Sequence, residues 1–196
     1  MSNNSDDVPV LVTERLMLTI PGAQAAPARV AFNRANQRHL EPWNPAMSAR
    51  DFDVEFWRVR LDGQVRQFKD GTRYAFSIFE RAGGPAGPLV GYVDFSEVVR
   101  GVFLACYMGY ALAETAQGRG YMTEAARAAV DYMFERVRLH RIMANYMPNN
   151  ARSAAVLERL GFTVEGRAKA YLYLAGAWQD HVLTSLTNPE PIVPLL

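Results

Sequence analysis

The stretch AETAQGRGYMTEAARAAV, from Ala113 to Val130, decides the fold because it joins an apolar strand pattern to a helix through two glycines. An alanine-rich helical pattern starts near Met122. Gly118 and Gly120 let the backbone approach a ligand without Cβ clashes. The first turn of a helix carries N–H groups without intrahelical partners, and these groups and the helix dipole favour an anion such as a phosphate. The stretch therefore predicts a phosphate-binding loop.

Two common phosphate-binding motifs are absent from this loop. It is too short for G-x-x-x-x-G-K-[ST], and it lacks the G-x-G-x-x-G of a dinucleotide-binding fold. Arg119, between the glycines, adds a positive charge. The alternative interpretation is a glycine-rich turn before a core helix, because short glycine motifs also arise without a ligand. The loop alone leaves both interpretations open.

The composition is that of one globular domain. The chain has 196 residues, of which 49% are hydrophobic and 21% charged, which is ordinary for a soluble protein. A net charge of +1 argues against bulk electrostatic binding to nucleic acid or to an anionic membrane. Cys106 is the single cysteine, so no intramolecular disulfide is possible and a reducing cytoplasm fits.

The ends of the chain differ from its middle. The polar, acidic start MSNNSDDVPV is unlike a signal peptide, and no apolar run approaches the roughly 20 residues of a membrane span. We expect a cytoplasmic protein with a disordered arm over residues 1–10 and a single domain over 11–188. Proline-rich residues 189–196 are expected to form an extended tail.

Hydrophobic periodicity predicts strands and helices that are mixed along the chain. The predicted strands are 13–20, 74–80, 89–95, 103–112, 141–147, 163–174 and 179–187. The predicted helices are 23–38, a helix ending near 69 behind a Ser48–Asp51 capping box, 122–137, and one between the N-cap Asn150 and the C′ residue Gly161. This order indicates an α/β (α+β) domain with a mixed, mostly antiparallel sheet of about seven strands and about four flanking helices.

Two motifs carry a resemblance to a known superfamily. QGRGYM resembles the Q/R-x-x-G-x-G/A loop of the GNAT N-acetyltransferases, with Met122 where glycine or alanine is usual. NNARSAAVLERLGF, which holds Asn150 and Ser153, resembles their N-x-x-S…L-G-F element. The resemblance covers nearly the whole chain and implies the GNAT fold. It also implies acetyl-coenzyme A (acetyl-CoA) as co-substrate, with its pyrophosphate on the glycine loop.

A narrower resemblance rests on six segments in register. They are similar to the ribosomal-protein-alanine N-acetyltransferases, the Rim type, and read TERL, HLEPWNP, FSEVVRG, ACYMGY, HRIMANYMPNN and DHVLTSLT. This resemblance implies acetylation of the N-terminal amine of a ribosomal protein, most often at alanine. An α-amino group has a pKa near 8, so a modest base or a water relay can deprotonate it more easily than a lysine amine near 10.4.

The resemblance also assigns the residues that bind acetyl-CoA. Its acyl arm is expected to lie along the strand that ends GYAL, where a bulge opens the sheet. The implied cofactor-binding residues are Tyr110, Ala111, Leu112, Gln117, Gly118, Arg119, Gly120, Tyr121, Met122, Thr123, Asn145 and Asn150. Asn150 has a second interpretation as an N-cap, and the two roles can coexist.

The catalytic assignments are less direct. Ser153 is implied as the donor of a proton to the coenzyme A sulfur, against the alternative of an ordinary first-turn residue. Leu172 stands where some Rim-type enzymes carry a glutamate, so that base is missing. Glu97 is the substitute that we expect, with Asp94 second; both could instead be ordinary loop charges, and a bound water could replace them.

Other reactive side chains offer simpler interpretations. Cys106 lies in an apolar strand without a nearby histidine and is expected to be a core residue. His39, His140 and His181 show no metal-ligand spacing, so we expect no metal. Trp43, Tyr92 and Phe95 are candidates for the acceptor cleft or for the core.

Three functions remain open from the sequence. The first is the ribosomal N-acetyltransferase, for which acidic Glu97 and Asp94 at the cleft mouth would suit a basic acceptor. The second is an acetyltransferase for a small amine such as an antibiotic or polyamine. The third is a non-catalytic acyl-CoA-binding or ribosome-assembly factor. We expect a monomer or weak homodimer without membrane or direct nucleic-acid binding.

Overall fold

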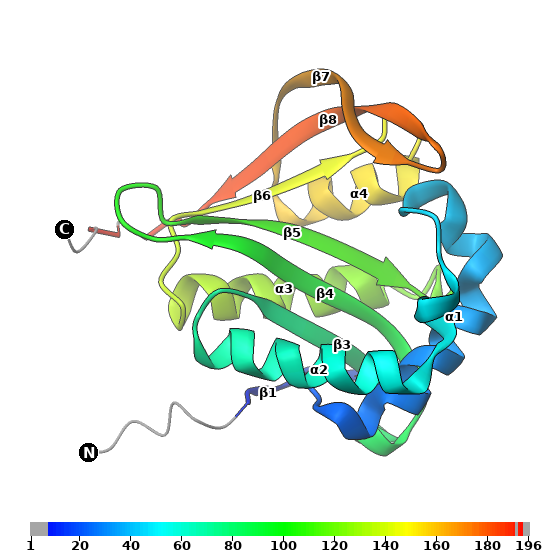
Figure 1. Ribbon diagram of the computed structural model, residues 1–196. Coiled ribbons are helices and arrows are strands. Elements are labelled where there is room, and N and C mark those ends of the chain that lie inside the picture. Colours follow the sequence, from blue (N-terminus) through cyan, green and yellow to red (C-terminus); the bar gives the residue numbers. More distant parts are fainter. Residues whose placement is uncertain (1–7, 191, 194–196) are drawn as a thin grey trace, which may run out of the picture.

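A computed structural model describes residues 8–190 and 192–193. Within them one mixed sheet of eight strands runs in the order β1-β2-β3-β4-β5-β6-β8-β7 (Figure 1). The strands are β1 (Val10–Val12), β2 (Leu16–Thr19), β3 (Tyr74–Glu80), β4 (Leu89–Val99), β5 (Ala105–Leu112), β6 (Arg141–Tyr146), β7 (Thr163–Leu174) and β8 (Ala177–Thr187). Only the β5–β6 pair is parallel. The predicted fold class is confirmed, with one strand more than the sequence indicated.

Four α-helices cover the two faces of the sheet (Figure 1). They are α1 (Ala26–Leu40), α2 (Val54–Lys69), α3 (Tyr121–Glu135) and α4 (Ala151–Leu160). Alternation along β4 separates the faces: Val93 is buried in the main core with Ala125 of α3, whereas Tyr92 meets Phe32 of α1. We call the Tyr92 side the α1 face of the sheet.

The sheet divides between β5 and β6. These strands pair only from Ala105 to Tyr107 against Arg141 to Met143, after which β6 stays with β8 and β5 stays with β4. Residues 108–112 of β5 therefore have no strand on the side away from β4, and their free backbone groups face a wedge. The opening of the sheet that the resemblance implied is present, but the expected bulge is not: β5 pairs regularly with β4 from Tyr107 to Leu112, and the sheet opens because β5 and β6 stop pairing.

Several predicted boundaries were wrong because a local turn or bulge interrupts the period. The predicted strand 13–20 is a turn followed by β2, since the Thr13 N–H donates to the Leu16 carbonyl at 2.9 Å. The strand predicted to end at 95 continues to Val99, so Glu97 lies within β4 and not in a loop. Residues 103–104 precede β5, and the predicted AGA break is shorter, with β8 starting at Ala177.

The helix ends follow the predicted chemistry with one refinement. The Ser48–Asp51 capping box is confirmed, but it caps a 3-10 turn over Ala49–Phe52, and Asp53 caps α2 itself. Asn150 caps α4 through Ser153 N at 3.0 Å. Gly161 ends α4 with φ of 89°, as a C′ glycine does.

The predicted termini lie partly outside the described residues. The expected arm over 1–10 falls mostly on residues 1–7, while β1 begins at Val10. Residue 191 and residues 194–196 of the expected tail also lie outside. None of the helices in the described part of the chain combines the length and apolar character that a membrane crossing requires.

Gly91 is the position in the sheet that is least tolerant of a side chain. A Cβ at Gly91 would lie 2.6 Å from the Ala111 carbonyl oxygen and 3.0 Å from Leu112. We expect Gly91→Ala to destabilise the protein by about 1–3 kcal/mol, which thermal denaturation would detect as a fall in Tm of several degrees. Gly166→Ala on β7 is the control, because its Cβ meets no atom within 4 Å. Equal melting temperatures for both variants would contradict this prediction.

Candidate active site

The glycine loop presents backbone donors, as the sequence predicted. Gly118 and Gly120 have φ of 74° and 76°, a left-handed conformation that favours glycine. Gly120 is the N-cap of α3, and no side chain caps this helix, whereas Asp53 and Asn150 cap α2 and α4. Among the described residues, no protein acceptor bonds the N–H groups of residues 118–123. This end of α3 is therefore suited to an anion.

Arg15 binds the backbone of the glycine loop. Its Nη1 donates to the Arg119 carbonyl at 2.8 Å, and its Nε donates to the Glu124 carboxylate at 2.7 Å. Burial acts to raise the pKa of Glu124, but hydrogen bonds from Thr13 and Arg15 outweigh it and lower that pKa. Because the Arg119 carbonyl is engaged on the Arg15 side, the loop backbone has a fixed orientation. No local pattern predicts this contact, which joins residues 104 positions apart.

Gln117 connects the loop to two helices. Its amide Nε2 donates to His39 Nε2 of α1 at 2.9 Å, and its Oε1 accepts from Arg152 Nη1 of α4 at 2.6 Å. His39 and Arg152 were not predicted to lie here. Arg152 is exposed, so its guanidinium can add a positive charge beside the predicted phosphate-binding loop.

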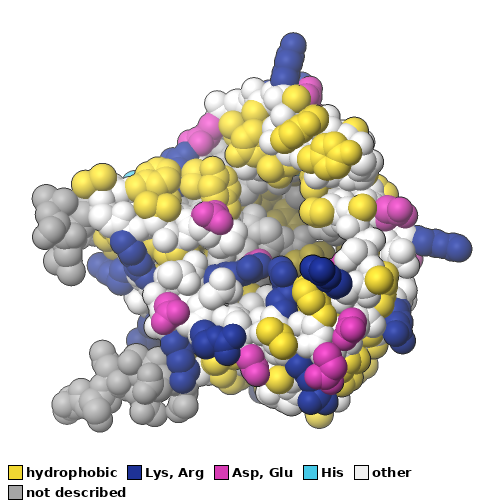
Figure 2. Space-filling view, viewed as in Figure 1, with side chains coloured by type: hydrophobic (Ala, Val, Ile, Leu, Met, Phe, Trp, Pro, Cys, Tyr) yellow, Lys and Arg dark blue, Asp and Glu magenta, His cyan; other side chains and the backbone are white. Residues whose placement is uncertain are grey.

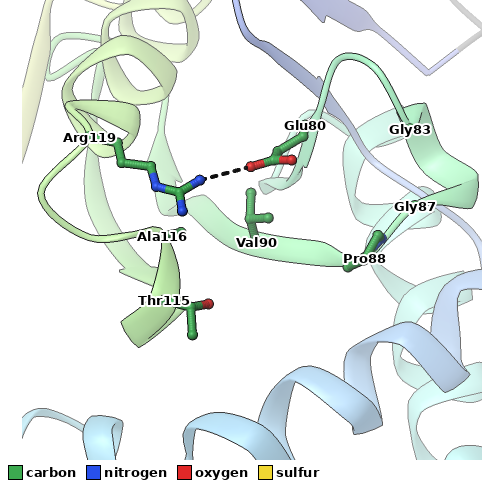
Figure 3. Close-up of a pocket in the computed structure, with 8 residues that line it drawn as sticks. All are labelled: Glu80, Gly83, Gly87, Pro88, Val90, Thr115, Ala116 and Arg119. Carbon is green, nitrogen blue, oxygen red and sulfur yellow. Dashed lines mark hydrogen bonds and ion pairs between the residues drawn. The ribbon is translucent and has the colours of Figure 1, made fainter.

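The side chains of the remaining loop residues point in different directions. Arg119 reaches to Glu80, with Nη1 and Oε1 3.5 Å apart, beside a pocket of about 280 Å³ between the loop and the β3–β4 turn (Figure 3). The Tyr121 hydroxyl donates to the same Glu80 oxygen at 3.2 Å. Met122 is buried in the main core, so only its backbone faces the ligand side. This explains why a large residue fits where the family motif has glycine or alanine. Thr123 is half-buried.

Tyr110 and Ser153 meet across the wedge between β5 and β6. The Tyr110 hydroxyl lies 2.8 Å from Ser153 Oγ and 3.2 Å from the Ser153 carbonyl oxygen. Burial raises the pKa of Tyr110 to about 12, so its phenol stays protonated. Ala111 and Leu112 continue β5 along the open edge. The structure thus brings Ser153, Tyr110 and the Asn150 cap together beside the wedge.

A second group of polar side chains lies on the α1 face, where β5 and β6 part. Tyr107 is the last residue of β5 that pairs with β6, and Asn145 Nδ2 donates to the Tyr171 hydroxyl at 3.3 Å. Burial, and then the neighbouring Tyr107 hydroxyl, raise the pKa of Tyr171. The His181 ring is 5.6 Å from the Tyr171 ring. Tyr107, Tyr171 and His181 were not predicted as site residues.

A register shift in β7 explains why Tyr171 was missed. The pairing with β8 is irregular between Ala168 and Leu172, and Ala170 has φ of 47°. Leu172 is 43% exposed, while its neighbour Tyr171 is half-buried against the site. The position where the family glutamate was expected therefore faces solvent, and Tyr171 takes the inward direction.

The structure does not bring the predicted acidic residues to Ser153. Glu97 is exposed at the β4 bulge, with φ of 52°, and lines a separate depression with Thr72 and Arg73. Asp94 forms an ion pair with Arg73 through both carboxylate oxygens. A catalytic role for Glu97 stays a prediction, and the charge of Asp94 is already balanced.

The remaining candidate residues from the sequence are Cys106 and three aromatic residues, and two of the four are core residues. Cys106 is fully buried, and burial raises its pKa to about 12. Phe95 is fully buried in the main core and so does not line the cleft, whereas Trp43 and Tyr92 are half-buried. Within the described residues no group of three or more His, Cys, Asp or Glu side chains is arranged to hold a metal.

The surface is hollowed over the wedge. Figure 2 shows this hollow between an apolar region over β7 and β8 and a rim of Lys and Arg side chains over β4. The exposed apolar residues of β7 and β8 include Leu172, Tyr173 and Trp178. We call this hollow on the α1 face the acceptor cleft.

Comparisons with known proteins agree with this geometry. The acetyltransferase (GNAT) domain model matches residues 15–163. The chain is 41% identical to the [ribosomal protein uS5]-alanine N-acetyltransferase of Escherichia coli (strain K12) over 92% of this chain and 91% of that protein. It is 32% identical to the probable N-acetyltransferase YjcK of Bacillus subtilis (strain 168), over 84% and 90% of the two chains.

Two solved structures are similar over most of their length. The ribosomal-protein-S5-alanine acetyltransferase of Vibrio fischeri has a TM-score of 0.88 at 36% identity and covers 93% of this chain and 98% of its own. Mycobacterium smegmatis RimJ, in complex with CoA-disulfide, has a TM-score of 0.81 at 32% identity, with coverages of 92% and 86%. The second structure shows that a protein with this fold binds coenzyme A.

Proposed function

Because this chain belongs to the GNAT acetyltransferase family, we propose that it acetylates the N-terminal amine of a ribosomal protein, with alanine as the first residue. One arrangement supports the proposal most strongly. The first turn of α3 has free N–H groups, and the wedge between β5 and β6 extends from that turn to Ser153. The identity to the uS5-alanine N-acetyltransferase over nearly the whole chain supports this acceptor class.

The residues of the loop and wedge fit acetyl-CoA. The N–H groups of residues 118–123 would bind its pyrophosphate, and Arg152 would add a cation nearby. The unpaired edge of β5 over residues 108–112 would bond the amides of the acyl arm in the way an added strand does. When bound there, acetyl-CoA supplies a thioester, which a neutral amine can attack.

The chain's own residues would complete the transfer. The acceptor amine enters from the α1 face, where the Tyr171 and Tyr107 hydroxyls and Asn145 can orient it by hydrogen bonds. An α-amino group with a pKa near 8 is partly neutral at pH 7, so water can remove its proton without a strong base. Ser153 Oγ would donate a proton to the departing sulfur and regain one from the attacking nitrogen, which must lose a proton to become the amide, while the Tyr110 hydroxyl stabilises the serine oxygen between the two transfers.

Intact-mass measurement tests the proposed function. We expect incubation with acetyl-CoA and unmodified ribosomal proteins to add one acetyl mass to a single ribosomal protein, at its N-terminal residue. A chemically blocked N-terminus on the same protein is the control and should prevent the gain. Acetylation of small amines alone would support the second function, and coenzyme A binding without any turnover would support the non-catalytic one.

A further inference from the structure

Arg29 of α1 carries a charge that no carboxylate balances. Its guanidinium carbon lies 4.2 Å from the centre of the Tyr92 ring, 4.5 Å from that of Trp57 and 5.7 Å from that of Phe32. Three aromatic rings therefore surround the cation, and burial lowers its pKa. Cation–π contacts of this kind offset only part of the cost of removing a guanidinium from water.

The nearby polar groups satisfy Arg29 only in part, since the Tyr92 hydroxyl acts to raise its pKa by a hydrogen bond but is no counter-charge. Its Nε is buried without a hydrogen-bond partner, and no ion pair to Arg29 is present among the described residues. The nearest acidic neighbour that affects it is Asp94, whose two oxygens already bind Arg73. Arg60, 5.4 Å from the centre of the Trp57 ring, adds a second positive charge. A buried donor and charge without a partner indicate a missing anionic group.

Arg29 stacks on the α1 face of β4, the strand next to β5 at the acceptor cleft. Tyr92, on which it stacks, shares the α1 face with Asp94, and Asp94 pairs with Gly109 of β5. A Cβ at Gly109 would meet no atom within 4 Å, so the cleft is open there. Tyr107, two residues before Gly109, begins the polar group around Tyr171. The rim of basic side chains over β4 in Figure 2 lies along this side of the hollow.

We propose that Arg29 binds a carboxylate side chain near the N-terminus of the acceptor and thereby selects acceptors that are acidic within their first few residues. The proposal rests on the proposed function. Gly109 pairs with Asp94 of the neighbouring strand, and Tyr92 lies two residues before Asp94. An extended peptide advances about 3.3 Å per residue. We therefore expect the selected carboxylate on about residue two to five of the acceptor.

A peptide series tests this selection without any mutation. Peptides that begin with alanine would carry a single Glu, or a Gln of the same shape, at position two, three, four or five. We expect the wild type to prefer Glu over Gln by about tenfold in kcat/KM at one of these positions. The preference should shrink at high salt. Equal kcat/KM for Glu and Gln at all four positions would overturn the proposal.

Variants then assign the preference to Arg29. Arg29→Met should abolish the Glu preference and Arg29→Lys should keep part of it, while Arg38→Met, at an exposed arginine of the same helix, should leave it intact. Persistence of the preference in Arg29→Met would exclude Arg29. If that variant does not fold, Arg29→Lys and the wild-type series still decide the matter.

A binding measurement separates this inference from the proposed function. The wild type is titrated with the Glu and Gln peptides in the presence of coenzyme A. This measures recognition of the carboxylate in the absence of turnover. Tighter binding of the Glu peptide supports the Arg29 site even if no peptide is acetylated, which would contradict only the proposed function. Equal binding of the two peptides would contradict the site, whatever the activity.

Discussion

Gly120→Asp is expected to weaken coenzyme A binding by about 100-fold while the protein stays folded. Aspartate is a favourable N-cap and tolerates left-handed φ better than most residues, so α3 should form as before. The new carboxylate, however, would bring a negative charge to the N–H groups that the pyrophosphate needs. Isothermal titration with coenzyme A measures the loss, and thermal denaturation shows that the fold is retained.

Gly120→Asn is the matched control for charge. It has the shape of the aspartate without its charge, so it should lose less affinity, and the difference between the two variants should shrink at high salt. Some of the added charge would be offset by Arg15, whose Nη2 would lie 3.5 Å from a Cβ at position 120. If Gly120→Asp bound coenzyme A as tightly as the parent, the phosphates would have to bind elsewhere.

Ser153→Ala should lower kcat by about 100-fold or more with little change in the affinity for acetyl-CoA. The serine hydroxyl is placed by Tyr110 at 2.8 Å and by the helix that Asn150 caps, and alanine keeps that helix. Only the proton donor is lost, so the effect should fall on turnover. Steady-state kinetics with an alanine-first peptide, together with direct titration of coenzyme A, separates the two quantities.

Tyr110→Phe separates the contribution of the Ser153 hydroxyl to turnover from that of the Tyr110 hydroxyl. This variant keeps the ring in the wedge but removes the hydroxyl that supports Ser153 Oγ, so we expect a smaller loss of about tenfold in kcat. A Ser153→Ala variant with kcat within twofold of the wild type would show that another group protonates the sulfur.

Local signals made part of the fold and site predictable. The capping box at Ser48, the cap at Asn150 and the glycine at Gly161 each act over a few residues, and all three were confirmed. The glycine loop at Gly118 and Gly120 was also predicted locally, from the missing Cβ atoms at a helix start, and the structure adds that both glycines have left-handed φ. The wedge between β5 and β6 came from the family resemblance, because no local pattern announces a loss of pairing.

Long-range packing hid the rest. Hydrophobic periodicity predicted the helix that ends near residue 69 but not which of its sides is buried: Val59 is 70% exposed, whereas Trp57 and Leu61 of α2 are buried. That side was selected by α1, whose Val30 packs against it. Arg29, His39 and Arg15 reach their partners from distant segments for the same reason. Because of a bulge in β7, Tyr171 and not Leu172 faces the site, and a strict alternation of inward and outward residues could not predict this.

The position of β8 between β6 and β7 has a consequence for biosynthesis. Among the described strands β8 comes last in sequence but lies inside the sheet, so β6 and β7 have no common partner until residues 177–187 have been synthesised. Domains form as units while the ribosome elongates the chain, and an unfinished sheet leaves edges open to other chains. Asn145 and Tyr171, which stand on the two strands that β8 joins, come together only then. The group proposed to orient the amine therefore forms only after residues 177–187 have been synthesised.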